Sequence, residues 1–153
     1  MPQNHPKWAK ILIGYYGLLQ TLHLLALVRA GAVLLLDGSF LFPILPPPGG
    51  WVSQAMPFLV GLGITDSIGI LLGLIFTAQF FVIKRLNRRL GVISLTIFIT
   101  GAVVFAISTV FNGAWAAHPL AYGGMTILFL PVPILYFWLL VSDLRRKSQA
   151  KSS

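Results

Sequence analysis

The residues of this chain with the clearest chemical potential are an acid and a histidine inside long apolar runs. Asp66 lies in the segment GLGITDSIGILLG, and His23 lies in the segment QTLHLLAL. A carboxylate that hydrogen-bonds to a histidine orients one tautomer of the ring and raises its basicity, as a general base requires. Ionisable side chains inside apolar membrane segments are costly and therefore mark candidate functional sites. We take Asp66 and His23 as the candidate catalytic residues.

Each of these residues also has a purely structural explanation. Arg29 is expected at a similar depth to Asp66, so the two side chains could form an ion pair between neighbouring helices. His23 could instead be a buried histidine whose ring is satisfied by Gln20 or by a backbone carbonyl. Because His23 and Arg29 point to different sides of an ideal helix, Asp66 is not expected to pair closely with both.

The composition of the chain places these residues in a membrane protein. Hydrophobic residues make up 57% of the 153 residues, and charged residues make up only 9%. A soluble domain carries about 25% charged residues, so this chain has too few to cover a water-facing surface. The length suits a single membrane domain over residues 1–153. The absence of cysteine excludes disulfides, thiolate nucleophiles and iron–sulfur clusters.

Four apolar runs are each long enough to cross a hydrocarbon layer as a helix, which takes about 20 residues. They predict an all-α integral membrane protein, a four-transmembrane-helix antiparallel bundle. The predicted spans cover about residues 8–28, 56–83, 90–111 and 120–141, with an outer loop at 37–55 and a cytoplasmic tail at 143–153. Pro131 and Pro133 should bend the fourth span, and the freed carbonyls of Ile127 and Phe129 would need other partners.

The basic residues indicate how this bundle is oriented. With four spans, nearly all of the 11 Lys and Arg residues fall on one side of the membrane. They are Lys7, Lys10, Lys84, Arg85, Arg88, Arg89, Arg145, Arg146, Lys147 and Lys151. Positive loops stay in the cytoplasm, which predicts that both termini are cytoplasmic. The net charge of +8 is therefore explained by topology, and nucleic acid is not an expected partner.

Polar residues gather on the side of the membrane away from these basic ends. At ~1.5 Å per residue, Asp66 lies ~27 Å from Lys84 and His23 lies ~20 Å from Lys10, in a core ~30 Å thick. The inner half lacks a continuous polar track, which argues against a channel or a proton wire. The predicted ligand-binding residues are Tyr16, Gln20, His23, Arg29, Asp66, Asn112 and Thr126.

The outer loop, DGSFLFPILPPPGGWVSQA, has an unusual composition. Its proline–glycine run excludes a regular helix, yet apolar residues flank that run, and Trp51 suits a membrane interface. The segment could be an interfacial loop without a ligand, or a lid over an outward-opening cavity. Both alternatives stay open from the sequence.

No metal or cofactor is expected from the sequence. The span interiors offer one histidine and one carboxylate, which is fewer ligands than a metal site needs. A haem held by His23 and His118 is the weaker alternative. No phosphate-binding loop, nucleotide fingerprint or hydrolase motif occurs.

The layout resembles two groups of small four-helix membrane proteins. Asp66 early in the second span, followed by the run Gly69–Gly73, is similar to the DoxX-like group. The LHLL segment at His23 and the proline-bent LPVPIL segment are similar to the EXPERA-type group. The EXPERA-type resemblance implies a membrane cavity that binds sterol-like molecules. Both resemblances cover most of the chain as architecture and imply the same four-span fold.

Three functions are compatible with these observations. The first is a membrane protein that binds or carries an amphipathic small molecule or lipid in an outer-leaflet pocket. The second is a membrane-embedded enzyme that uses Asp66 and His23 for acid–base chemistry on a lipid-soluble substrate. The third is an accessory subunit, or a homo-oligomer, whose glycine-rich helix faces pack against another membrane protein.

Overall fold

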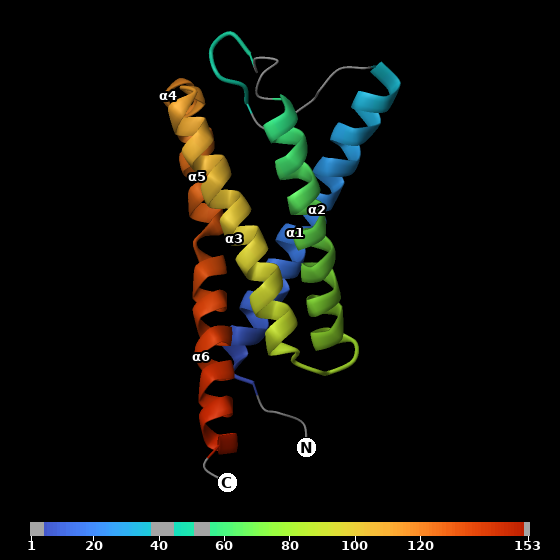
Figure 1. Cartoon of the computed structure of the whole chain (residues 1–153), viewed down its shortest axis with the longest axis vertical. Helices are drawn as coiled ribbons and strands as arrows, with labels where there is room; N and C mark the ends of the chain where they lie inside the picture. Colours follow the sequence, from blue (N-terminus) through green and yellow to red (C-terminus); the bar gives the residue numbers. More distant parts are fainter. Residues whose placement is uncertain (1–4, 38–44, 51–55, 152–153) are drawn as a thin grey trace.

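The computed structural model of the protein describes residues 5–37, 45–50 and 56–151, and most of these residues are helical (Figure 1). The helices are α1 (Lys7–Asp37), α2 (Met56–Phe81), α3 (Arg88–Phe111), α4 (Ala114–Ala117), α5 (Pro119–Phe129) and α6 (Pro131–Lys151). No strand occurs in the three described ranges. The predicted all-α class is therefore confirmed.

Four helical stretches are long and apolar enough to cross a membrane. They are Lys7–Asp37, Phe58–Phe81, Arg88–Phe111 and Pro119–Arg145. The prediction of four helices that could span a membrane is therefore confirmed for the described part of the chain. The first helix runs past the predicted end near residue 28, because the following residues are mostly alanine and leucine and include no proline.

The fourth span is interrupted at its prolines, as the sequence predicts. α5 ends at Phe129 and α6 begins at Pro131, with Leu130 between the two helices. Proline has no backbone N–H and its ring crowds the preceding turn, so a continuous helix cannot pass through Pro131 and Pro133 without loss. The span is therefore built from two helices.

The carbonyls around this break find partners, although not all as expected. The Ile127 carbonyl accepts from the Leu130 N–H at 3.2 Å, which tightens the last turn of α5. The side-chain donor from a neighbouring helix is Tyr15 of α1, whose hydroxyl donates to the Leu128 carbonyl at 2.6 Å. The sequence had pointed to the carbonyls of Ile127 and Phe129, so the residue that receives this bond lies between the two predicted ones.

The two ends of the molecule differ in composition. In Figure 1 the start of α1, the turn between α2 and α3, and the last turns of α6 lie at the same end. We call this the basic end, because Lys7, Lys84 and Arg145 lie there. Residues 45–50 and α4 lie at the opposite end, which we call the loop end. The fold thus brings the widely separated basic segments together.

The turn between α2 and α3 is closed by specific backbone contacts. Lys84 has a φ of 57°, and the Arg85 N–H donates to the Gln79 carbonyl at 3.0 Å, which terminates α2. Asn87 caps α3, because its side-chain oxygen accepts from the Leu90 N–H at 3.2 Å. These contacts hold α2 and α3 side by side.

The tightest packing lies in the half of the bundle nearer the basic end. The core cluster consists of Ile13, Tyr16, Phe76, Phe80, Leu95, Phe98, Val132, Leu135 and Leu139. Glycines let α1 and α2 approach closely here. A Cβ at Gly17 would lie 2.5 Å from Thr77 Cγ2, and a Cβ at Gly73 would lie 2.9 Å from Tyr16 Oη. This contact anchors α1 through its first half.

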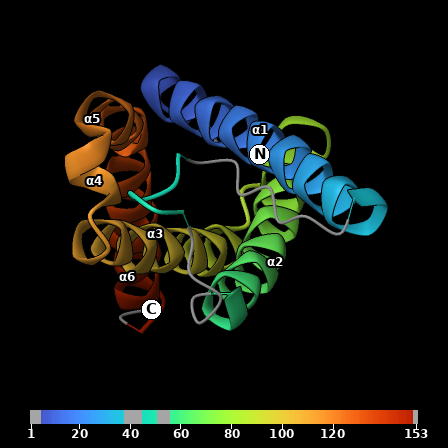
Figure 2. The ribbon, with the colours of Figure 1, turned by 90° about the horizontal axis from the view of Figure 1, so that it is seen from above.

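The loop-end half of α1 is packed much less tightly. The buried residues of α1 all lie in its first half, and the last of them is Gln20. Leu25 and Val28 are both 60% exposed. Figures 1 and 2 agree that this half of α1 diverges from α5. The helices therefore leave room for a cavity between them at the loop end.

Candidate functional site

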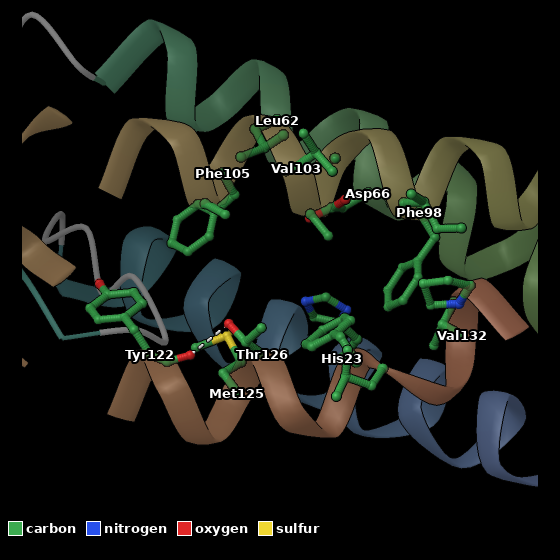
Figure 3. A pocket seen from close by; sticks show the side chains of 18 of the residues that line it. His23, Leu62, Asp66, Phe98, Val103, Phe105, Tyr122, Met125, Thr126 and Val132 are labelled. Atoms are coloured by element: carbon green, nitrogen blue, oxygen red, sulfur yellow. Dashed lines mark hydrogen bonds between the residues drawn. The ribbon is translucent and has the colours of Figure 1, made fainter. Parts of the chain in front are cut away.

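A cavity of about 290 Å³ lies in the loop-end half of the bundle (Figure 3). Residues of α1, α2 and α3 line it together with residues of α4, α5 and α6. Most of the lining side chains are aliphatic or aromatic. The polar groups that reach it are few, and the most important come from His23, Asp66, Tyr122 and Thr126.

Asp66 enters the cavity from α2, where the sequence of α3 makes room for it. A Cβ at Gly101 would lie 2.7 Å from Asp66 Oδ1 and 3.7 Å from its Cγ. Any larger residue at position 101 would therefore compete with the carboxylate for the same space. The structure records no hydrogen bond or ion pair for Asp66 within the described residues. The carboxylate therefore fits the space beside Gly101, and its oxygens remain able to accept hydrogen bonds.

His23 enters the cavity from α1 and is held by aromatic rings. Its ring lies edge-on to Phe98, with centroids 5.7 Å apart, and to Phe129, with centroids 6.5 Å apart. Phe98 and Phe129 stack on each other at 5.2 Å. Edge-to-face and offset-stacked geometries are the favoured arrangements for such rings. These contacts orient the imidazole without using its nitrogen atoms.

Asp66 and His23 face each other across the cavity (Figure 3). They are near enough to interact electrostatically. However, the two described side chains do not form the direct hydrogen bond that the sequence analysis predicted. The space between the carboxylate and the imidazole is part of the cavity itself.

The ion pair considered between Asp66 and Arg29 is not formed either. Arg29 is exposed and does not line the cavity. It lies on a different side of α1 from His23, as the helical period requires. It also belongs to the half of α1 that diverges from the bundle. The alternative explanation of Asp66, a structural ion pair with Arg29, is therefore wrong for this structure.

The hydroxyl groups of Tyr122 and Thr126 in the cavity already donate hydrogen bonds to backbone carbonyls. The Tyr122 hydroxyl donates to the Leu45 carbonyl at 2.7 Å. The Thr126 hydroxyl donates to the Tyr122 carbonyl at 2.9 Å (Figure 3). Each hydroxyl oxygen keeps its ability to accept a hydrogen bond. Trp115 stacks on Tyr122, with centroids 5.8 Å apart, and completes the loop-end wall.

The segment Leu45–Gly50 is tied to this wall. Besides the bond from Tyr122, His118 Nε2 lies 3.2 Å from the Pro46 carbonyl oxygen. Pro48 Cδ lies 3.9 Å from the position of a Cβ at Gly113. Figure 2 shows this segment over the space that the helices surround. The rest of the predicted outer loop, residues 38–44 and 51–55, lies outside the described residues.

Three of the seven predicted ligand-binding residues line the cavity, namely His23, Asp66 and Thr126. The other four lie elsewhere. Tyr16 and Gln20 are fully buried, and Tyr16 donates to Ser94 Oγ at 3.3 Å. Both amide atoms of Gln20 lack a hydrogen-bond partner within the described chain. Asn112 ends α3, and its Oδ1 accepts from the Ala114 N–H at 3.0 Å.

Sequence reasoning missed the aromatic part of the site. Phe98 and Phe105 of α3, and Tyr122 and Phe129 of α5, line the cavity, as does Trp115 of α4. The sequence did contain a signal for four of them. Phe98 and Phe105 are seven residues apart, as are Tyr122 and Phe129, so each pair lies on one face of its helix. What the pattern lacked was any indication of which helix faces meet.

No group of three or more potential metal ligands occurs among the described residues. No family model, curated protein or solved structure matches the chain. The resemblances to DoxX-like and EXPERA-type proteins therefore stay predictions.

Proposed function

We propose that this protein binds or carries an amphipathic small molecule or lipid in the loop-end cavity. The observation that supports this most directly is an apolar cavity within the bundle into which Asp66 and His23 project from facing helices. Small-molecule sites are typically apolar concavities of about 300–1,000 Å³ with a few well-placed polar groups. A cavity of about 290 Å³ is close to the lower end of that range.

The proposal includes an orientation in the membrane. The four spans run antiparallel, with both termini and the basic end in the cytoplasm and the cavity in the outer leaflet. The support for this is the concentration of Lys and Arg at the basic end. A ligand in that leaflet would meet the cavity directly from the lipid.

The orientation can be tested cleanly because the chain contains no cysteine. Single cysteines at exposed positions of each end, Ala117→Cys at the loop end and Ile83→Cys at the basic end, give matched reporters. In intact cells a membrane-impermeant maleimide should label the first and not the second. Labelling of position 83 alone would reverse the proposed orientation.

The binding function is tested by filling the cavity. Ala106 of α3 lines it, whereas Val110, one turn later on the same helix, is 58% exposed and does not. Ala106→Trp should abolish binding of tritiated 1-decanol by protein in lipid nanodiscs, and Val110→Trp should leave that binding unchanged. Wild-type protein that takes up no more 1-decanol than empty nanodiscs would contradict the proposal.

The subunit alternative is less well supported than binding. Gly73 already serves the α1–α2 contact, and a Cβ at Gly69 would lie 3.0 Å from Ile97 Cγ2 of α3. Gly69 and Gly73 are therefore used inside the bundle, whereas Gly61, Gly123 and Gly124 have no atom within 4 Å of their Cβ positions. The enzyme alternative keeps Asp66 and His23 as its acid–base groups, and no further observation favours it over binding.

A further inference from the structure

We infer that the head group of the ligand donates hydrogen bonds and carries no negative charge. This rests on the proposed binding function and specifies the chemistry of its ligand. An alkyl ammonium ion and an alcohol share this chemistry, whereas a fatty acid, a sulfate or a phosphate does not. The reason lies in the balance of charges and of donors and acceptors around the cavity.

The charge balance excludes an anionic head. Asp66 is the only formally charged side chain that lines the cavity in the described structure, and no Lys or Arg lines it. The segments 38–44 and 51–55 contain no charged residue, so they cannot add a cation. An anion buried without a counter-charge is strongly disfavoured, and here it would also be close to a carboxylate.

The hydrogen-bond balance points the same way. The hydroxyl hydrogens of Tyr122 and Thr126 are both used on backbone carbonyls, so these oxygens can only accept from a ligand. The carboxylate of Asp66 adds two more acceptor atoms with no partner within the described residues. Among the lining side chains of the described residues, the remaining donors are one imidazole N–H of His23 and the indole N–H of Trp115. The cavity is therefore rich in acceptors and poor in donors.

The geometry places the head group between Asp66 and His23. These side chains face each other without bonding, and the cavity runs between them (Figure 3). A donor there would satisfy the carboxylate, which otherwise remains unpaired in apolar surroundings at a considerable cost. The rings of Phe98, Phe105 and Phe129 line the cavity and would contact the apolar part of the ligand.

The test uses four probes with the same decyl chain and different heads. They are decylammonium, 1-decanol, decyltrimethylammonium and decyl sulfate, whose binding to protein in nanodiscs is measured by equilibrium titration against empty nanodiscs. Decylammonium and 1-decanol should bind, and decyl sulfate should bind at least ~10-fold more weakly than either. Decyltrimethylammonium has the charge without a donor, so it should bind more weakly than decylammonium.

Two variants locate the effect at Asp66. Asp66→Asn should weaken decylammonium by at least ~10-fold and 1-decanol by less than ~3-fold, because the amide keeps one acceptor but no charge. Gly101→Ala should also weaken decylammonium, because its Cβ would lie 2.7 Å from Asp66 Oδ1 and would displace the carboxylate. This second variant retains the charge, so it covers the case in which Asp66→Asn fails to fold.

The outcomes separate this inference from the proposed function. Equal binding of all four probes, abolished by Ala106→Trp, would leave the cavity as the binding site and overturn the head-group inference. An unchanged decylammonium affinity in a folded Asp66→Asn protein would also overturn it. Failure of all four probes to bind the wild-type protein would contradict the binding function itself.

Discussion

At the scale of single residues, the position of the Asp66 carboxylate depends on Gly101, which has no side chain to crowd it. The two positions lie on α2 and α3, and Asp66 Oδ1 lies only 2.7 Å from the position that a Cβ at residue 101 would take. A glycine in the middle of a helix costs about 0.5–1 kcal/mol relative to alanine, so its use here has to be explained by packing or function. Housing a carboxylate beside an apolar cavity is such a use.

Gly101→Ala separates stability from function at this position. The added methyl improves helix propensity but forces the carboxylate to move, so the unfolding free energy should stay within about 1 kcal/mol of wild type. The affinity for decylammonium should fall about tenfold. The control is Gly61→Ala on α2, which has no atom within 4 Å of its Cβ position and does not line the cavity. Equal affinities in the two variants would show that the position of Asp66 does not matter.

At the scale of helices, α1 is fixed by the contact of its first half with α2. Gly17 packs against Thr77, and Gly73 packs against Tyr16 and Gln20. Small residues at these points bring the two backbones close together, which is how helices gain packing energy in a membrane. The same anchoring lets the second half of α1 diverge and leave the cavity open.

A larger residue at position 73 should therefore weaken the whole bundle. Gly73→Leu would drive its side chain into Tyr16 Oη and Gln20 Cγ, which lie 2.9 Å and 3.0 Å from the Cβ position. Overpacking of this kind costs about 1–3 kcal/mol. Thermal unfolding in detergent should show the loss, whereas Gly31→Leu, with no atom within 4 Å of its Cβ position, should unfold like wild type. Equal unfolding temperatures would mean that the helices can separate here without loss.

At the scale of the whole molecule, His5 connects the start of the chain to the other basic-end segments. Its ring packs against Phe80, with centroids 5.7 Å apart, and against Trp138, with centroids 6.3 Å apart. Burial, and then the positive charges of Arg88 and Lys10, lower the pKa of His5 from its ordinary value of 6.5. The folded state therefore disfavours the protonated ring more than the unfolded state does.

The sign of the resulting pH dependence follows from this lowered pKa. As pH falls through 6.5 toward the folded-state pKa, the unfolded state takes up the proton first, and stability is lost. Between about pH 8 and pH 5, wild type should lose more thermal stability than His5→Gln, which cannot titrate. Comparing the two proteins cancels the contributions of all groups that they share. Parallel pH profiles would show that protonation of His5 is not linked to folding.

The sequence by itself determined the class of the molecule. The chain has too few charges to cover a soluble surface, four long apolar runs and clustered basic residues, which together predict an all-α membrane protein. The structure confirms the helical class and four helices long and apolar enough to span a membrane. The break at Pro131 was also predictable, because a missing N–H acts locally whatever surrounds it. These features depend on composition and on near neighbours in the chain.

Only the tertiary structure decided which polar residues share a site. Helical periodicity gives the face of each residue on its own helix, but not the partner face, the tilt or the point at which two helices diverge. His23, Asp66 and Thr126 meet at the cavity, while Arg29 and Asn112 lie outside it. The close contact of Gly17 with Thr77 and the space at Gly101 set these positions. Both depend on how side chains of different helices fit together, which no single helix specifies.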